Sequence, residues 1–250
     1  MVLYEYPFNE GIRTMLRLES LFDRLGQLVP RDPPMDHHFA LATVFEIVEV
    51  ASRADLKSDV LKELERQRTQ FLAWRGNPAI SEAALDSVIG RIERALAALA
   101  DQPGKAGQSL MTNEWLMSLR SRIGIPGGTC EFDLPGYHAW QQHAPERRRA
   151  DLTRWTACLL PLAQALQLVL SLLRDSGSTQ RVVAAGGNFQ QTLPSGKVYH
   201  LLRLQLADDG LVPEITGHRS IVSVRLMRPD ADGRLRPAGG DPSFELTVCA

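Results

Sequence analysis

The hydrophobic period of the chain changes along its length, and this change constrains the fold more than any other feature. From about residue 9 to residue 123, apolar residues recur every three to four positions, as in amphipathic helices. Beyond residue 176 this period disappears, and short β-rich runs alternate with clusters of Gly, Pro, Asn and Asp. We therefore predict an α+β fold, with an N-terminal α-helical domain over residues 1–115 and a C-terminal antiparallel, sandwich-like β domain over residues 116–250.

The N-terminal helices have recognisable ends. Asn9 and Ser81 are placed to accept backbone N–H bonds as N-caps, and the Pro-rich segment from Pro30 to Pro34 ends the first helix. We predict five helices in this half of the chain, over about residues 9–28, 36–52, 56–76, 81–99 and 112–123.

The predicted β domain contains one long helical segment, over about residues 145–174, and Pro161 should kink it or split it into two helices. Before it, residues 125–135 combine Pro and Gly pairs with alternating residues, which suggests a turn followed by a short strand. The apolar faces of the later strands need a partner layer, either the long helix or a second sheet. The expected strands cover residues 181–184, 189–193, 198–206, 221–227 and 244–248.

Net charge limits the partners that the whole chain could attract. The 28 basic and 29 acidic residues give a net charge of −1, so the protein as a whole is not a polycation for nucleic acid or an anionic membrane. Residues 1–115 carry 13 basic and 17 acidic groups, and residues 116–250 carry 15 and 12. Any basic site must therefore be local.

Cysteine usage and hydropathy favour a cytoplasmic protein. The cysteines, Cys130, Cys158 and Cys249, are odd in number and widely separated, which supports neither a disulfide framework nor a zinc site. The N-terminus lacks the features of an export signal. The most apolar stretch, residues 158–173, is shorter than the roughly 20 residues of a membrane span, so we expect a core helix there and no membrane partner.

No catalytic or cofactor motif is present. The sequence contains no GxxxxGK[ST], GxGxxG after a strand, HExxH or GxSxG pattern. The histidine pairs, residues 37–38 and residues 138 and 143, lack the i, i+4 spacing of helical metal ligands. We expect a non-enzymatic protein without cofactor or metal, and we interpret the pair Gly127–Gly128 as a turn.

Arginine is the most informative residue type. Arg13, Arg17 and Arg24 lie along one edge of the first helix, Arg120 and Arg122 close the helix before residue 125, and Arg219 and Arg225 lie in a strand region. Each one alone is typical of a solvated face with weak ion pairs. The run Arg147–Arg149 opens the long helix, where the macrodipole disfavours cations, so it is either solvated or used for binding.

Two other functions remain open at this point. A nucleic-acid-binding module could use Arg147–Arg149 and the mildly basic second half of the chain, although the net charge argues against it. A small-molecule enzyme could use a pocket around His138, His200 and His218, although the sequence supplies no nucleophile with its base.

Four blocks of sequence carry a resemblance to a known family. They are YEYPFNEGIRTMLRLE at residues 4–19, LKELERQ at residues 61–67, IPGGTCEFDLPGYHAW at residues 125–140 and ITGHRS at residues 215–220. With these blocks the chain resembles, over nearly its whole length, the ZapD family of Z-ring-associated bacterial cell division proteins.

The resemblance implies a cytoplasmic homodimer at the division site that has no enzymatic activity. It also implies binding to the C-terminal tail of the tubulin-like GTPase FtsZ through a basic pocket, so that two sites per dimer cross-link and bundle filaments. Matched positions, with Arg120 added from the helix before the third block, place the expected tail site at Arg13, Arg17, Arg53, Arg120, His138, Arg219 and Arg225. This chain departs from the family pattern at Ile221 and at Glu114–Trp115, where relatives can have basic residues.

Elementary chemistry is consistent with this expectation. A tail that carries carboxylates and apolar side chains would use guanidinium groups as bidentate partners and a groove for its apolar anchors. A dimer with two such sites would gain avidity for a polymer, since the second binding event is intramolecular.

Overall fold

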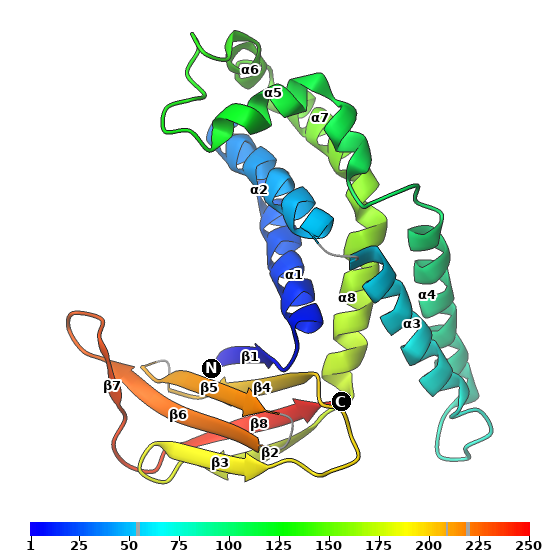
Figure 1. Ribbon diagram of the computed structural model, residues 1–250, viewed down its shortest axis with the longest axis vertical. Coiled ribbons are helices and arrows are strands. Elements are labelled where there is room, and N and C mark those ends of the chain that lie inside the picture. The colour runs from blue at the N-terminus through cyan, green and yellow to red at the C-terminus, as the bar shows by residue number, and fades with distance from the viewer. Residues whose placement is uncertain (54–55, 209, 219–220) are drawn as a thin grey trace. The chain divides into compact units, whose positions relative to one another are not determined.

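The computed structural model describes residues 1–53, 56–208, 210–218 and 221–250, without the side chains of residues 53 and 218 (Figure 1). It confirms an α+β protein, with helices in the N-terminal half and antiparallel sheets in the C-terminal part. Its internal contacts divide the chain into a β unit, Met1–Thr14 with Leu170–Ala250, and a helical unit, Met15–Val169. The domain boundary at residue 115 stays a prediction from composition.

The five helices predicted in the N-terminal half are confirmed. Asn9 Oδ1 accepts a hydrogen bond from the backbone N–H of Ile12 at 2.9 Å, and Ser81 Oγ accepts one from Ala84 at 3.4 Å. These bonds satisfy N–H groups that have no partner within the helix. The helices are α1 (Glu10–Leu28), α2 (Pro34–Arg53), α3 (Leu56–Leu72), α4 (Glu82–Ala100) and α5 (Glu114–Ile123), with a 3₁₀ helix, η1 (Gln108–Thr112), before α5.

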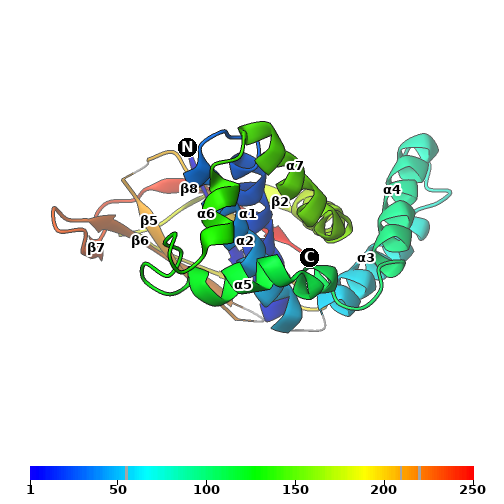
Figure 2. The same ribbon diagram turned by 90° about the horizontal axis from the view of Figure 1, so that it is seen from above.

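Helices α3 and α4 form a hairpin whose members lie side by side (Figure 1, Figure 2). The side chain of Gln67 on α3 is buried and donates to the carbonyl oxygen of Val169 at 3.2 Å. Val169 is fully buried in α8 (Leu160–Asp175). A polar anchor thus joins the hairpin to the apolar helix within the helical unit.

The long helical segment is split, as the sequence predicts from Pro161. Helix α7 (Pro145–Thr156) is followed by a 3₁₀ turn, η2 (Ala157–Leu159), before α8 begins. Pro161 therefore lies in the first turn of α8, where its missing N–H costs no helical hydrogen bond.

The stretch Pro145–Asp175 has the length and hydropathy of a membrane span, and it is the one such stretch in the described part of the chain. The core helix of a globular protein meets the same requirements. Leu162, Leu166 and Val169 are almost fully buried within the protein, which is typical of a core helix.

The prediction of a short strand within residues 125–135 is wrong. Gly128 N–H donates to Ile125 O, Cys130 N–H to Gly127 O, and Leu134 N–H to Cys130 O. Bonds to carbonyls three or four residues back form consecutive turns and leave no groups for a strand ladder. Helix α6 (Pro135–Gln141) follows these turns.

Two antiparallel sheets form the β unit (Figure 1). One sheet has the order β1–β4–β8–β2, and the other has the order β3–β6–β5 with β7 paired to β6. The strands are β1 (Val2–Pro7), β2 (Ser178–Val183), β3 (Asn188–Thr192), β4 (Leu201–Leu206), β5 (Val212–His218), β6 (Ile221–Pro229), β7 (Leu235–Pro237) and β8 (Ser243–Cys249).

A second sheet, one of the two predicted possibilities, covers the apolar strand faces. Leu204 of β4, Val224 of β6 and Leu246 of β8 are at most 1% exposed and belong to one core cluster. Alternation along each strand places these residues on a single face, so the two sheets share one core.

Candidate binding site

Two of the predicted tail-binding arginines belong to the β unit and lie in weak, exposed ion pairs. Arg13 Nε lies 3.3 Å from Glu10 Oε2 on the same helix, and its side chain is 40% exposed. Arg225 of β6 lies 3.8 Å from Glu214 of β5, and its side chain is 59% exposed. Exposed pairs of this kind contribute between zero and about 1 kcal/mol, so an incoming carboxylate can replace the partner at little cost.

Three other predicted residues belong to the helical unit. Arg17 lies four residues after Arg13, on the same side of α1, and is exposed. His138 is exposed on α6. Arg120, in the last turn of α5, is partly exposed and donates from Nη1 to Met111 Sδ at 3.0 Å. Arg219 and the side chain of Arg53 lie outside the described part of the chain.

Other arginines are fixed by the fold. Arg148 on α7 is only 3% exposed and donates from Nε to His37 Nδ1 at 2.9 Å. Its Nη1 and Nη2 atoms donate to the backbone carbonyls of Gln141, His143 and Asp32. This guanidinium therefore ties the start of α7 to α2 and to the end of α6.

The expectation that Arg147–Arg149 form a solvated or binding run is therefore wrong for Arg148. Arg148 is buried, and Arg149 pairs with Asp32 and with Glu146. Only Arg147 of this run is exposed. Burial thus removes Arg148 from the arginine patch that a nucleic-acid-binding module would use, and leaves the exposed Arg147 and the partly exposed, ion-paired Arg149.

A second fixed cluster lies within the β unit. Glu5 of β1 accepts hydrogen bonds from Arg174 on α8 at 2.8 Å and from Arg203 of β4 at 3.0 Å. The carboxylate of Glu5 is only 17% exposed. The neighbouring thiol of Cys249 is buried, and burial raises its pKa to about 11, so it is not a thiolate nucleophile at neutral pH.

The histidines proposed for an enzyme pocket belong to different units. His138 lies in the helical unit, whereas His200 lies in the β unit, where its Nδ1 is 3.1 Å from Asn9 Nδ2. The side chain of His218 lies outside the described residues.

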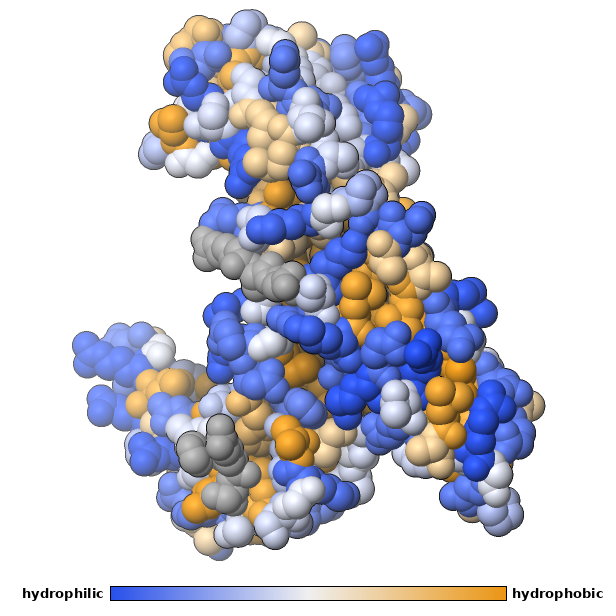
Figure 3. Space-filling model, turned by 45° about the vertical axis from the view of Figure 1, so that its right-hand side comes forward, coloured by the Kyte–Doolittle hydropathy of each residue, from blue (hydrophilic) through white to orange (hydrophobic). Residues whose placement is uncertain are grey.

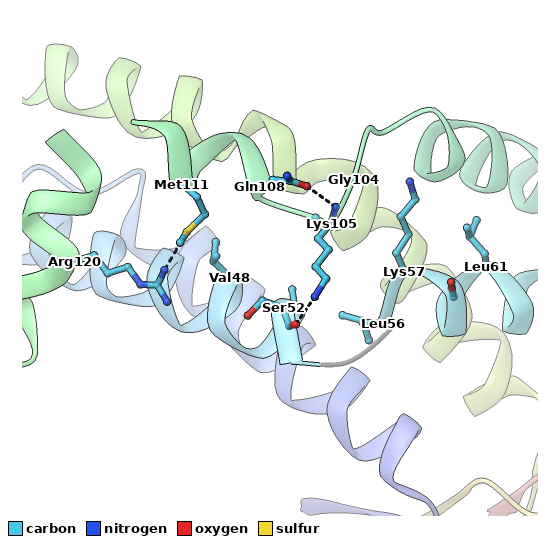
Figure 4. A pocket seen from close by; sticks show the side chains of 13 residues that line it. Val48, Ser52, Leu56, Lys57, Leu61, Gly104, Lys105, Gln108, Met111 and Arg120 are labelled. Atoms are coloured by element: carbon cyan, nitrogen blue, oxygen red, sulfur yellow. Dashed lines mark hydrogen bonds between the residues drawn. The ribbon is translucent and has the colours of Figure 1, made fainter. Parts of the chain in front are cut away.

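The helical unit contains a cavity of about 640 Å³ between the end of α2, the start of α3 and the loop before α5 (Figure 4). Its apolar lining includes Val48, Leu56, Leu61, Ala106 and Met111. Its volume falls in the usual range for ligand sites.

Hydrophobic surface on one face of the protein also occurs in patches bordered by hydrophilic residues (Figure 3).

Three cations line this apolar cavity: Lys57, Lys105 and Arg120. Arg120 lies at one end, Lys57 at the other, and Lys105 between them (Figure 4). Lys57 Nζ donates to the carbonyls of Ala100 and Gln102, and Lys105 Nζ donates to Ser52 O at 3.0 Å. Within the described residues, none of the three pairs with a carboxylate.

The cavity contains one residue of the predicted tail site, Arg120, and sequence reasoning missed its other two cations. Lys57 and Lys105 are 48 positions apart, and the sequence shows neither as part of a motif. Both lysines lie beside an apolar surface and donate to backbone carbonyls, and this arrangement exists only in the folded helical unit. Arg17 and His138 do not line this cavity.

Comparison with known proteins agrees with the sequence resemblance. A family model described as ZapD, cell division protein, matches residues 16–225. Proteins named Cell division protein ZapD from Ralstonia pickettii (strain 12J) and Ralstonia nicotianae (strain ATCC BAA-1114 / GMI1000) are each 52% identical to this chain over 251 aligned residues. A protein of the same name from Cupriavidus pinatubonensis (strain JMP 134 / LMG 1197) is 51% identical. Each alignment covers 100% of this chain and 99% of the relative. The chain therefore belongs to the ZapD family of cell division proteins.

Proposed function

We propose that this protein binds the C-terminal tail of FtsZ and, as a homodimer, cross-links FtsZ filaments into bundles at the cytoplasmic division site. It performs no catalysis in this role. The tail site contains the predicted set: Arg13, Arg17, Arg53, Arg120, His138, Arg219 and Arg225.

The observation that carries this proposal is the contrast between two classes of arginine. The predicted arginines whose side chains are described keep exposed surface, and the ion pairs of Arg13 and Arg225 are long and solvated. Arg148 and Arg174 instead complete internal networks. Arginines in weak pairs can exchange their partners for the carboxylates of a peptide, whereas arginines in buried networks cannot do so without loss of stability.

In this proposal, filaments are bundled because each dimer has two tail sites, and each single site need not bind tightly. When one tail of a filament is bound, the second site of the dimer finds a neighbouring tail at high effective concentration. Many modest contacts along two polymers therefore hold the filaments together, and each contact can still exchange.

Calorimetric titration with the FtsZ tail peptide tests the site. We expect Arg17→Glu and Arg225→Glu each to weaken binding by roughly 10-fold or more, because a charge-assisted hydrogen bond becomes a repulsion. The matched controls are Arg91→Glu in the helical unit and Arg234→Glu in the β unit, both exposed arginines outside the predicted set. Equal weakening by all four changes would show a general charge effect and would remove the assigned arginines from the site.

Sedimentation with FtsZ filaments tests the function itself. The wild-type protein should increase the amount of pelleted polymer and produce bundles under the electron microscope. Arg17→Glu should reduce both, while its thermal melting stays that of the wild type. Unchanged pelleting with the wild-type protein would contradict the proposal.

A further inference from the structure

Two neighbouring histidines in the first turns of α2 make different contacts with α6 and α7. His37 is fully buried, and its Nδ1 atom lies 2.9 Å from Arg148 Nε on α7. His38 Nδ1 lies 2.7 Å from the hydroxyl of Tyr137 on α6. A guanidinium can only donate, so His37 Nδ1 is the acceptor and the ring of His37 is neutral. A hydroxyl can donate or accept, so of these two bonds only that of His37 requires a neutral ring.

Arg148 connects His37 to the end of α6. Its Nη1 atom donates to Gln141 O at 2.8 Å and to His143 O, and its Nη2 atom donates to Asp32 O. Gln141 is the last residue of α6, and Asp32 lies just before α2. One guanidinium therefore ties the start of α2, the end of α6 and the first turn of α7 together, and its Nε is held by the acceptor on His37.

A proton on His37 would turn this hydrogen bond into a repulsion. The ring would lose its acceptor, and two cations would lie next to each other at buried positions. His37 and Arg148 each lie in the first turn of their helix, where the macrodipole disfavours positive charge. Burial lowers the pKa of His37 and the charge of Arg148 lowers it further, while the carbonyls of Arg31 and Val29 act in the opposite direction.

The acidic residues near this contact belong to other ion pairs. In the part of the chain that the structure describes, these pairs are Asp36 with Arg31, at 3.8 Å, and Asp32 and Glu146 with Arg149. The hydrogen bonds of Arg148 instead go to one imidazole and to backbone carbonyls. A second positive charge at His37 would therefore meet a guanidinium that has no carboxylate bonded to it among the described residues.

The groups that face His37 from α6 and the turn after it supply no negative charge. The ring of Trp140 is 6.3 Å from that of His37, centroid to centroid, and is uncharged. His143 is titratable and gives its carbonyl to Arg148. On α2 itself the next titratable group is His38, whose pKa burial lowers.

We propose that His37 and Arg148 form a proton-sensitive latch, in which neutral His37 holds Arg148 in place and protonation of His37 releases the end of α6 from the start of α2. In the released state the guanidinium turns towards water, and the carbonyls of Gln141 and His143 lose their donor. Helix α6 carries His138 of the predicted tail site, so mild acid would loosen the element that presents this residue. The latch goes beyond the proposed function and does not depend on it.

Hydrogen exchange measured by mass spectrometry tests the latch in the full-length protein without any partner. The quantity compared is the protection of residues 135–143 at pH 7.5 and pH 5.5, corrected for the intrinsic pH dependence of exchange. A single proton that binds the open state with a pKa near 6.5 can raise the open population by at most about 10-fold over this range. We therefore expect protection to fall about 5- to 10-fold more in the wild-type protein than in His37→Asn.

The variants isolate the proton on His37. His37→Asn places an amide oxygen near the position of Nδ1 and does not titrate, and His38 is present in both proteins. His37→Gln, with thermal melting as the check on folding, repeats the comparison with a second neutral acceptor. His138→Asn is the matched control, because it removes an exposed histidine from α6 itself, and it should keep the wild-type loss of protection.

Three results would overturn the latch. Wild-type protection that stays within about twofold between the two pH values would show that α6 is not released. An equal loss in the wild-type protein and both His37 variants would show that another group causes the release. Disappearance of the loss in His138→Asn would assign it to an exposed histidine. None of these results bears on the tail site, because no peptide is present.

Discussion

At the scale of single residues, Arg148 is the position where we expect substitution to lower the stability of the fold most. It is 3% exposed, and its guanidinium serves one imidazole nitrogen and three backbone carbonyls. Arg148→Met would fill much of the same volume and leave those acceptors buried without a donor. We expect a loss of about 2 to 4 kcal/mol in the free energy of unfolding, measured by urea denaturation.

The neighbouring arginine provides the control for this prediction. Arg147 is exposed, so Arg147→Met should change the free energy of unfolding by no more than about 0.5 kcal/mol. A similar small effect for Arg148→Met would mean that water replaces the guanidinium and that the network does not stabilise the helical unit.

His37 should make stability depend on pH. Burial lowers its pKa below the usual value near 6.5, and the charge of Arg148 lowers it further. The unfolded state therefore binds this proton at higher pH than the folded state does. The contribution of neutral His37 is fully present above about pH 6.5 and is lost as the pH falls through that value towards the folded pKa.

Urea midpoints at pH 7.5 and pH 5.5 check this dependence. The wild-type protein should lose more stability between these values than His37→Gln, which has no titrating group at this position. His38, whose pKa burial also lowers, is retained in both proteins, so the difference between them reports His37. Equal losses in both proteins would refute the assignment.

At the scale of elements, Gly187 is a position that the β unit requires. Its φ of 78° lies in the left-handed region, and an added Cβ would overlap the carbonyl oxygen of Ala238. Its own carbonyl accepts the N–H of Leu226 at 2.8 Å, so the turn cannot shift freely away from β6. Gly187→Ala should cost about 2 to 4 kcal/mol in thermal or urea unfolding.

Gly239 is the matched control in the same region. No atom lies within 4 Å of the position where its Cβ would be built, and its φ is not positive. Gly239→Ala should change stability by less than about 0.5 kcal/mol. A comparable loss in both variants would indicate a general sensitivity of this segment rather than the close approach at Gly187.

Helices were predictable from sequence because their signal is local. The apolar period, the N-caps at Asn9 and Ser81 and the break at Pro161 depend on neighbouring residues alone. Strands β1, β5 and β7 were missed. Strands β5 and β7 pair with their sequence neighbour β6, but pairing can also join segments far apart along the chain, and such pairing leaves no local signal in the sequence. Strand β1, for example, pairs Tyr4 with Leu204. Residues 125–135 looked like a strand, but local turns satisfied their backbone groups.

At the scale of the whole molecule, bundling should require two occupied sites on one particle. Excess free tail peptide should dissolve preformed FtsZ bundles, because it occupies each site separately and removes avidity. Light scattering and pelleting should then fall together, while the protein remains a dimer by analytical ultracentrifugation. Bundles that persist at saturating peptide would show that contacts other than the tail hold the filaments.

The sequence by itself determined the α+β class, the helices, the split at Pro161 and the family, because these depend on local periodicity and on blocks of consecutive residues. Only the tertiary structure decided which cations the fold uses. It buries Arg148, ties Arg174 to Glu5 and places Lys57 and Lys105, which donate to backbone carbonyls, beside an apolar cavity. The reason is physical: desolvation and pairing are set by neighbours in space, and residues that are far apart along the chain supply those neighbours.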